Sequence, residues 1–362
     1  MKFEVQKELL LNGIQKIQGV ITSRATLPIL SHILLEVTQD TLRLTATDLD
    51  IGISCVIPVE TRESGAITVP AKRFSDIIKE LPSDTININT KKNNLIIIEA
   101  ESCQFKILGL NKEDFPKLPE IKEGRAIKLE QADLKHMLQL TSFAVSYDET
   151  RYILNGMLLQ IQDNKLTLVS TDGKRLAYFE KTLQQTSDKT VHIIIPIKVL
   201  HELSRNLQEG TLSLLVGHNQ ALFDLNDMII ISRLIEGEFP DYQQVIPKTS
   251  DNKMRVSRDG FLLALKRASL LTTPDYQAVK LEIFKNKLVV SKSTPDIGEH
   301  REEVSIVYQG KEIAIGFNPQ YLIDVLKNLG EETIELELTD SEKPGVIRVN
   351  GYVYIVLPMR LG

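Results

Sequence analysis

One short segment of the chain, Ser170-Thr171-Asp172-Gly173-Lys174-Arg175-Leu176, combines an acid, a glycine and two cations. Cations beside a glycine could bind a phosphate group, and the acid could transfer a proton there. The GxxxxGK[ST] spacing of a phosphate-binding loop is absent, however. Asp and Gly are also typical of a tight turn that ends a β-strand. The segment therefore predicts a strand-ending turn, with a phosphate-handling enzyme centred on Asp172, Lys174 and Arg175 as the alternative.

No other group of residues has the spacing of a catalytic or metal site. The six histidines form no HExxH pattern or paired Cys/His spacing, and no G-x-S-x-G elbow is present. Cys55 and Cys103 are too few for a disulfide framework, which indicates a reducing environment. The amino terminus lacks an apolar run of the signal-peptide type, and no segment approaches the roughly 20 apolar residues that span a bilayer. We therefore expect a cytoplasmic protein without metal, cofactor, membrane contact or catalytic activity.

The charge distribution leaves room for a polyanionic partner. A net charge of −5 argues against a surface that binds nucleic acid everywhere, but not against a basic lining inside an acidic shell. Basic residues recur on or beside the predicted helices: Arg24, Lys72, Arg73, Lys79, Lys135, Lys198, Arg205, Lys266, Arg267 and Lys327. If all these helices face one way, that side is basic. The alternative is that each is an ordinary solvated helix face.

The carboxyl-terminal residues 352–361 remain apolar almost to the last position, whereas chain ends are normally frayed and polar. They predict a final β-strand. A second interpretation is that the part after Pro358 lines a hydrophobic groove for a partner, because methionine and leucine suit a surface that accepts varied apolar side chains.

These segments belong to a unit that the chain contains three times. Each copy begins with a short alternating strand that leads into an amphipathic helix. The copies lie 124 and 251 positions apart: Phe3, Val5, Leu10 and Ile14; Ile127, Leu129, Leu134 and Leu138; Met254, Val256, Phe261 and Leu265. A threefold repeat of domain size predicts an architecture that builds a geometry rather than one catalytic cleft.

Each repeat also consists of two similar halves. The first-half residues Phe3, Val5, Leu10 and Ile14 match Ile67, Val69, Phe74 and Ile78. Hairpin patterns follow each helix, and a proline stands at the start of each second helix, at Pro70, Pro196 and Pro319, which the first turn tolerates. We predict an α+β fold of three domains, each with two β-α-β-β-β halves, antiparallel sheets and packed helices. Linkers rich in proline and charge place the domains at 1–123, 124–250 and 251–362.

Seven motifs on this repeated scaffold resemble the family of bacterial sliding clamps, the beta subunits of DNA polymerase III, over the whole length. They are Arg24-Ala25-Thr26-Leu27-Pro28-Ile29-Leu30, Thr45-Ala46-Thr47-Asp48-Leu49, Thr68-Val69-Pro70-Ala71-Lys72-Arg73-Phe74, Arg151-Tyr152-Ile153-Leu154-Asn155-Gly156-Met157, Thr171-Asp172-Gly173-Lys174-Arg175-Leu176, Glu238-Phe239-Pro240-Asp241-Tyr242 and Leu357-Pro358-Met359-Arg360-Leu361. The chain departs from the family pattern at Lys174 and Gln244, which replace a histidine and an arginine, and at Glu149, which replaces an uncharged residue.

The resemblance implies a head-to-tail homodimer that closes as a ring around duplex DNA, with helices lining a central hole and sheets outside. Contacts to backbone phosphates carry no sequence information, so such a ring slides. It implies a processivity factor rather than an enzyme, without cofactor. Its partners are the polymerase III catalytic subunit, the clamp loader, and other polymerases and repair proteins that bind through short linear peptides.

The same resemblance assigns three sets of residues. The peptide-binding groove comprises Arg151, Leu154, Thr171, Gly173, Lys174, Arg175, Leu176, Pro240, Gln244, Val245, Asn318, Tyr321, Ile355, Leu357, Pro358, Met359, Arg360 and Leu361. The DNA-binding set is Arg24, Lys72, Arg73, Tyr152, Lys198, Arg205, Lys266 and Arg267. The dimer interface combines an edge strand, Phe105, Lys106, Ile107 and Leu108, with Leu270, Leu271, Glu299, Glu302 and Glu303. Besides the ring and the phosphate-handling enzyme, the third alternative is an open three-domain scaffold that binds proteins but not DNA.

Overall fold

The computed structural model describes residues 1–21, 27–119, 121, 126–183, 190–250 and 252–361. The chain divides into two compact units. The first unit contains Met1–Leu134 and His201–Leu234, and the second contains Lys135–Leu200 and Ile235–Gly362.

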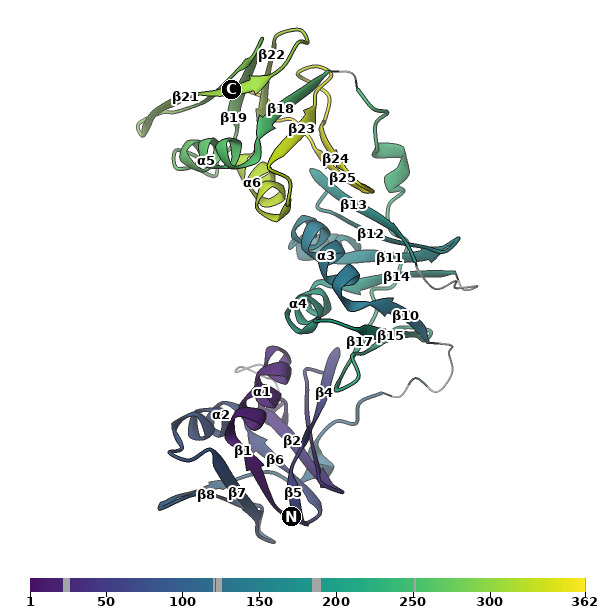
Figure 1. Cartoon of the computed structure of the whole chain (residues 1–362), viewed down its shortest axis with the longest axis vertical. Coiled ribbons are helices and arrows are strands. Elements are labelled where there is room, and N and C mark those ends of the chain that lie inside the picture. Colours follow the sequence, from purple (N-terminus) through teal and green to yellow (C-terminus); the bar gives the residue numbers. More distant parts are fainter. Residues whose placement is uncertain (22–26, 120, 122–125, 184–189, 251, 362) are drawn as a thin grey trace. The chain divides into compact units, whose positions relative to one another are not determined.

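Six α-helices occur in the described residues, two in each repeat, as the apolar spacing predicts (Figure 1). They are α1 (Lys7–Ile17), α2 (Ala71–Glu80), α3 (Gln131–Thr141), α4 (Ile197–Asn206), α5 (Arg258–Ser269) and α6 (Pro319–Asn328). Helices α1 and α2 pack side by side, and so do α5 and α6. The matching positions Leu10, Ile14, Phe74 and Ile78 are all buried, and each such side chain stabilises the fold by roughly 1.5–3 kcal/mol.

The first unit contains two antiparallel sheets. The five-stranded sheet has the order β5 (Glu60–Glu63), β1 (Lys2–Gln6), β7 (Thr85–Thr90), β8 (Leu95–Ala100), β9 (Cys103–Leu108). The eight-stranded sheet has the order β10 (Ile127–Glu130), β15 (Thr211–Val216), β16 (Gln220–Asp224), β17 (Met228–Arg233), β4 (Ile51–Pro58), β3 (Thr41–Thr47), β2 (His32–Thr38), β6 (Gly65–Pro70).

The second unit is built on one twelve-stranded sheet. Its order is β14 (Val191–Pro196), β11 (Gly156–Gln162), β12 (Lys165–Thr171), β13 (Arg175–Thr182), β25 (Tyr352–Val356), β24 (Gly345–Val349), β23 (Thr333–Glu337), β18 (Lys253–Ser257), β21 (Gly298–Val307), β20 (Lys287–Thr294), β19 (Val279–Phe284), β22 (Ile313–Phe317). Strand pairs β4–β17 and β13–β25 join one repeat to the next, so the sheets continue across repeat boundaries.

Two features differ from the sequence expectations. The halves of a repeat exchange strands, because β6 pairs with β2 and β1 pairs with β7, so each half's first strand lies in the sheet of the other half. Of Pro70, Pro196 and Pro319, only Pro319 lies in the first turn of its α-helix. Pro70 precedes α2 in an extended conformation, and Pro196 ends β14, because both backbones still pair with a neighbouring strand.

Within the described part of the chain, no helix is long and apolar enough to cross a membrane, and no group of three or more His, Cys, Asp or Glu residues is placed to hold a metal ion.

Candidate functional site

The turn between β12 and β13 is closed by its own side chains. Thr171 Oγ1 donates to the Arg175 carbonyl at 2.5 Å and accepts from the Gly173 N–H at 3.0 Å. Asp172 Oδ1 accepts from the N–H groups of Lys174 and Arg175, at 2.9 and 3.0 Å. The prediction of a strand-ending turn is confirmed, and Asp172 serves as the residue that caps it.

Arg175 is held from three directions. It is 9% exposed, and its Nε donates to Asp172 Oδ2 at 3.0 Å. Nη1 donates to Asp324 Oδ2 on α6 at 2.6 Å, and Nη2 donates to the Phe143 carbonyl at 2.6 Å. The guanidinium also lies 4.6 Å from the centre of the Tyr321 ring. Because each of its three nitrogens already donates within the protein and the side chain is buried, Arg175 is poorly placed to bind a phosphate, which argues against the phosphate-enzyme alternative.

A buried tyrosine completes this arrangement. Burial raises the pKa of Tyr354 above its ordinary value, so the phenol is neutral. Its hydroxyl donates to the Tyr321 carbonyl at 2.7 Å, which ties β25 to the first turn of α6.

Gly173 has a structural reason to be glycine. Its φ is +84°, and a Cβ there would lie 2.6 Å from Arg151 Nη1, which itself donates to the Asp172 carbonyl at 2.9 Å. The matching turn of the first repeat has Leu49 at φ 81°, so a side chain is possible in this conformation. The close approach of Arg151 Nη1, the end of a flexible side chain, is therefore what distinguishes Gly173 from Leu49.

We expect Gly173→Ala to lower the free energy of unfolding by about 1–2 kcal/mol and to displace Arg151, since strain and contact act together. Gly210→Ala is the matched control, because Gly210 has φ +95° and no atom within 4 Å of the added Cβ. Urea unfolding of both variants separates the two contributions. Equal losses would show that the Arg151 contact plays no part.

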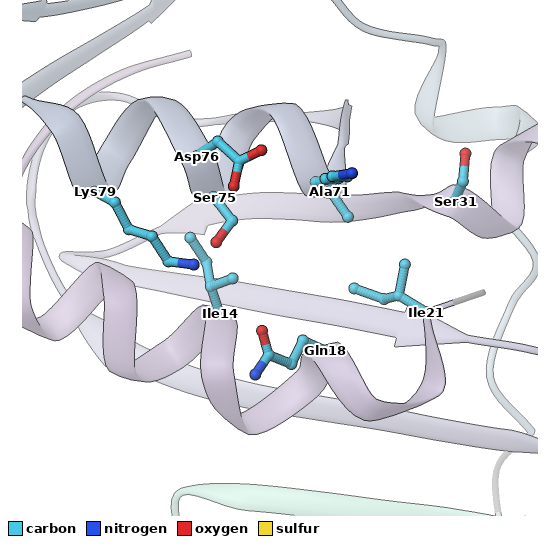
Figure 2. Close-up of a pocket in the computed structure, with 9 residues that line it drawn as sticks. Ile14, Gln18, Ile21, Ser31, Ala71, Ser75, Asp76 and Lys79 are labelled. Atoms are coloured by element: carbon cyan, nitrogen blue, oxygen red, sulfur yellow. The ribbon is translucent and has the colours of Figure 1, made fainter. Parts of the chain in front are cut away.

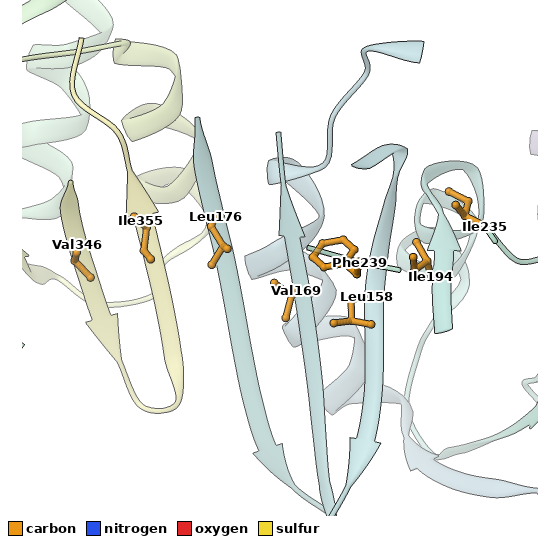
Figure 3. Packing of buried hydrophobic residues seen from close by; sticks show 8 residues of the cluster. All are labelled: Leu158, Val169, Leu176, Ile194, Ile235, Phe239, Val346 and Ile355. Atoms are coloured by element: carbon orange, nitrogen blue, oxygen red, sulfur yellow. The ribbon is translucent and has the colours of Figure 1, made fainter. Parts of the chain in front are cut away.

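An apolar face lies beside this turn on the twelve-stranded sheet and the segment that follows β17. Figure 3 shows its buried residues, which are Leu158, Val169, Leu176, Ile194, Ile235, Phe239, Val346 and Ile355. Leu154, one of the predicted groove residues, is partly buried and packs against this cluster. Leu176 and Ile355 are directly paired across β13 and β25.

The segment after Phe239 covers part of the apolar face and alternates in exposure. Tyr242 and Ile246 pack against the cluster, and the Tyr242 ring lies 5.7 Å from that of Tyr178. The predicted residues Pro240, Gln244 and Val245 point outward and are exposed, with Val245 at 55%. Sequence reasoning missed Phe239, Tyr242 and Ile246, although their spacing of three and four positions was a usable signal.

The carboxyl-terminal segment lies against the same turn. The Leu357 N–H donates to the Lys174 carbonyl at 2.9 Å, and the Met359 N–H donates to the Gly316 carbonyl at 2.8 Å. Leu357 and Leu361 remain 43% and 40% exposed. In the carboxyl-terminal segment Pro358 is half-buried and Arg360 is exposed. The predicted groove residue Asn318 caps α6 by accepting from the Gln320 N–H at 3.0 Å. The structure thus brings the Gly173 turn and the apolar tail together, as predicted.

The predicted DNA-binding residues lie in both units. In the first unit Lys72 and Arg73 are exposed on α2, and in the second Tyr152, Lys198 and Lys266 are exposed. A cavity of about 250 Å³ lies between α1 and α2, with Lys79 and Gln18 directed into it (Figure 2). Arg24 lies outside the described residues.

Two of the predicted DNA-binding arginines have acidic partners within the chain. Arg205 contacts the buried Glu202 at 2.5 Å and donates to the Lys16 carbonyl at 3.1 Å. Burial raises the pKa of the Glu202 carboxyl, with Arg205 opposing it. Arg267 binds both oxygens of Glu302, at 2.5 and 2.8 Å, so a predicted DNA-binding residue and a predicted interface residue pair with each other.

The predicted interface residues lie at free strand edges and on exposed loops. Strand β9, which carries Phe105, Lys106, Ile107 and Leu108, is the last strand of its sheet, and Leu108 is 66% exposed. Strand β21 carries Glu299, Glu302 and Glu303, and pairs with β18 only through Ile306 and Val307. Leu270 is 80% exposed and Leu271 is half-buried.

Known proteins show the same sequence and fold pattern. Three family models match the chain: the N-terminal domain of the DNA polymerase III beta subunit over residues 1–119, its central domain over 128–241 and its C-terminal domain over 243–360. The beta sliding clamp of Chlamydia pneumoniae is 35% identical over 363 residues, covering 100% of this chain and 99% of that protein. Two solved structures of sliding clamps match this chain, and each match covers 100% of this chain and 100% of the solved chain. One is from Bacillus subtilis (33% identity, TM-score 0.94), and the other is from Pseudomonas aeruginosa bound to griselimycin (34% identity, TM-score 0.95).

Proposed function

Because this chain belongs to the DNA polymerase III beta subunit family, the sliding clamps, we propose that two copies close head to tail into a ring around duplex DNA. It is a processivity factor and not a catalyst, since the clamp tethers the polymerase that carries out synthesis. Processivity in such a ring comes from topology rather than from tight binding. The proposed domains are 1–123, 124–250 and 251–362.

The free strand edges support the ring. Strand β9 and the open part of β21 each lack a neighbour on one side among the described residues. Pairing β9 of one copy with β21 of the other would continue the sheet and remove both edges. Lys106 on β9 would then approach Glu299 and Glu303 on β21, and opposite charges favour this register.

DNA contact through side chains such as Lys72, Arg73, Lys198 and Lys266 would neutralise phosphates without reading bases. A net charge of −5 fits this role, because the acidic residues can lie on the outside while basic helix residues meet the DNA.

The apolar face beside the Gly173 turn is the proposed docking groove. The observation that carries this assignment is the junction of that turn with the exposed Leu357 and Leu361, next to the paired Leu176 and Ile355. Short peptides with leucine or aromatic anchors would bury the exposed side chains of Leu357 and Leu361. The proposed partners are the polymerase III catalytic subunit, the clamp loader, and other polymerases and repair proteins, which would share one groove.

Size in solution tests the ring. We expect sedimentation equilibrium to give about twice 40.8 kDa for the intact chain. Leu108→Asp should give monomers, because it places a charge on an exposed edge strand without changing the chain's own core. Leu9→Asp, on the exposed face of α1, is the matched control and should remain dimeric. An intact chain that stays monomeric at micromolar concentration would favour the open-scaffold alternative.

A further inference from the structure

The pairing of β4 with β17 in the first unit repeats the pairing of β13 with β25 in the second. Gly52 pairs with Ile231 in the first unit, as Leu176 pairs with Ile355 in the second, each residue 124 positions later. The Arg233 N–H donates to the Asp50 carbonyl at 3.0 Å, and its counterpart, the Leu357 N–H, donates to Lys174 at 2.9 Å. The two repeat junctions therefore have the same backbone geometry.

The turns at the two junctions are also alike. Thr47 Oγ1 donates to the Ile51 carbonyl at 2.8 Å and accepts from the Leu49 N–H at 3.0 Å. Asp48 Oδ1 accepts from the N–H groups of Asp50 and Ile51, at 3.1 and 2.9 Å. These are the bonds that Thr171 and Asp172 make in the second unit.

A cavity of about 300 Å³ lies at this first junction, in the position of the proposed groove. Its lining includes Leu49, Gly52 and Ile231 from the sheet, with Pro116 and Leu118 from the segment that follows Phe115. That segment corresponds to Pro240 and Tyr242, and Phe115 is buried as Phe239 is.

Two matched positions differ between the junctions: Gly52 stands where the groove has Leu176, and Leu118 stands where the groove has Tyr242. At Gly52 the sheet lacks the leucine that Leu176 supplies, and a Cβ there would lie 2.2 Å from Leu118 Cδ2. The chain thus fills this part of its own cleft with a leucine, the type of anchor that a docking peptide would supply. Around the opening lie Lys117, Arg233 and Asp50, and the Arg233–Asp50 pair is 4.0 Å apart and exposed, hence weak.

We propose that the first junction is a second peptide cleft, built like the groove and held closed by Leu118. Its ligand is a short peptide with an aliphatic anchor that replaces Leu118 and an acidic residue that faces Lys117 and Arg233. This inference rests on the proposed function of the groove.

The test uses the full chain and a fluorescein-labelled synthetic peptide that carries one leucine, one phenylalanine and one glutamate. Equilibrium dialysis should show one peptide per intact chain and two per Leu118→Ala chain. Gly52→Ala should have the same effect by an independent route, because its Cβ displaces the flexible end of Leu118. Leu9→Ala, the same truncation at an exposed leucine of the same unit, should leave the number at one.

Combining Leu118→Ala with deletion of residues 359–362 separates the two claims. The second cleft should still bind one peptide, and a photoreactive version should label residues near Ile231. One peptide per chain for the intact protein and for both opened variants would overturn the second cleft and leave the groove intact. No binding to the intact chain would overturn the proposed function, and the inference with it.

Discussion

Replacing Arg175 by methionine is expected to lower the free energy of unfolding by about 3–5 kcal/mol, the usual cost of removing one partner from a buried ion pair. Arg175 is 9% exposed, and it neutralises both Asp172 and Asp324. Methionine fills much of the volume but leaves two carboxylates near a low-dielectric interior. The Phe143 carbonyl also loses its donor.

Two comparisons isolate this effect in urea unfolding. Arg233→Met removes an exposed arginine whose partner Asp50 lies 4.0 Å away, and it should change stability by less than about 0.5 kcal/mol. Arg175→Met combined with Asp324→Leu should recover part of the loss, because one stranded charge is then gone. If Arg175→Met is as stable as the intact chain, the ion pairs do not hold the turn to α6.

Deleting residues 359–362 is expected to weaken peptide binding by at least about 100-fold. The deletion removes Met359 and Leu361 from the proposed groove, and burying such side chains contributes roughly 1.5–3 kcal/mol each. The sheet should remain, because β25 ends at Val356 and its pairing with β13 lies before the deletion. Fluorescence polarisation with the leucine- and phenylalanine-containing peptide measures the affinity.

The control for this deletion is whether the shortened chain still folds and dimerises. Dimer size should match that of the intact chain, since the predicted interface residues lie on β9, on β21 and at Leu270 and Leu271. The melting temperature should fall slightly, because the hydrogen bond from Met359 to Gly316 is lost. Unchanged peptide affinity in a correctly assembled deletion variant would refute the groove assignment.

The elements of the fold were predictable because burial follows local periodicity. Leu10 and Ile14, with Phe74 and Ile78, mark the helix faces in the sequence, and the same residues are buried in the structure. The exchange of strands between halves was not predictable, because β1 could pair with several strands of similar alternation.

The site was predictable in outline and not in its contacts. The unusual Gly173 and the apolar tail marked the two segments that meet, because both depart from the repeat. The burial of Arg175 could not be read from the sequence, since its partner Asp324 lies 149 positions away. The same holds for Arg267, whose partner Glu302 lies 35 positions away, whereas Glu202 lies one helical turn before Arg205 and was a usable signal.

Retention on circular against linear DNA tests the central claim most directly. The clamp is assembled on a nicked circular duplex by a clamp loader, separated from free protein by gel filtration, and the DNA is then cut once with a restriction enzyme. We predict that the protein stays with the circle at a salt concentration that disrupts ordinary phosphate contacts, and leaves once the DNA has ends. Equal retention on circular and linear DNA would contradict a closed ring that holds DNA by topology.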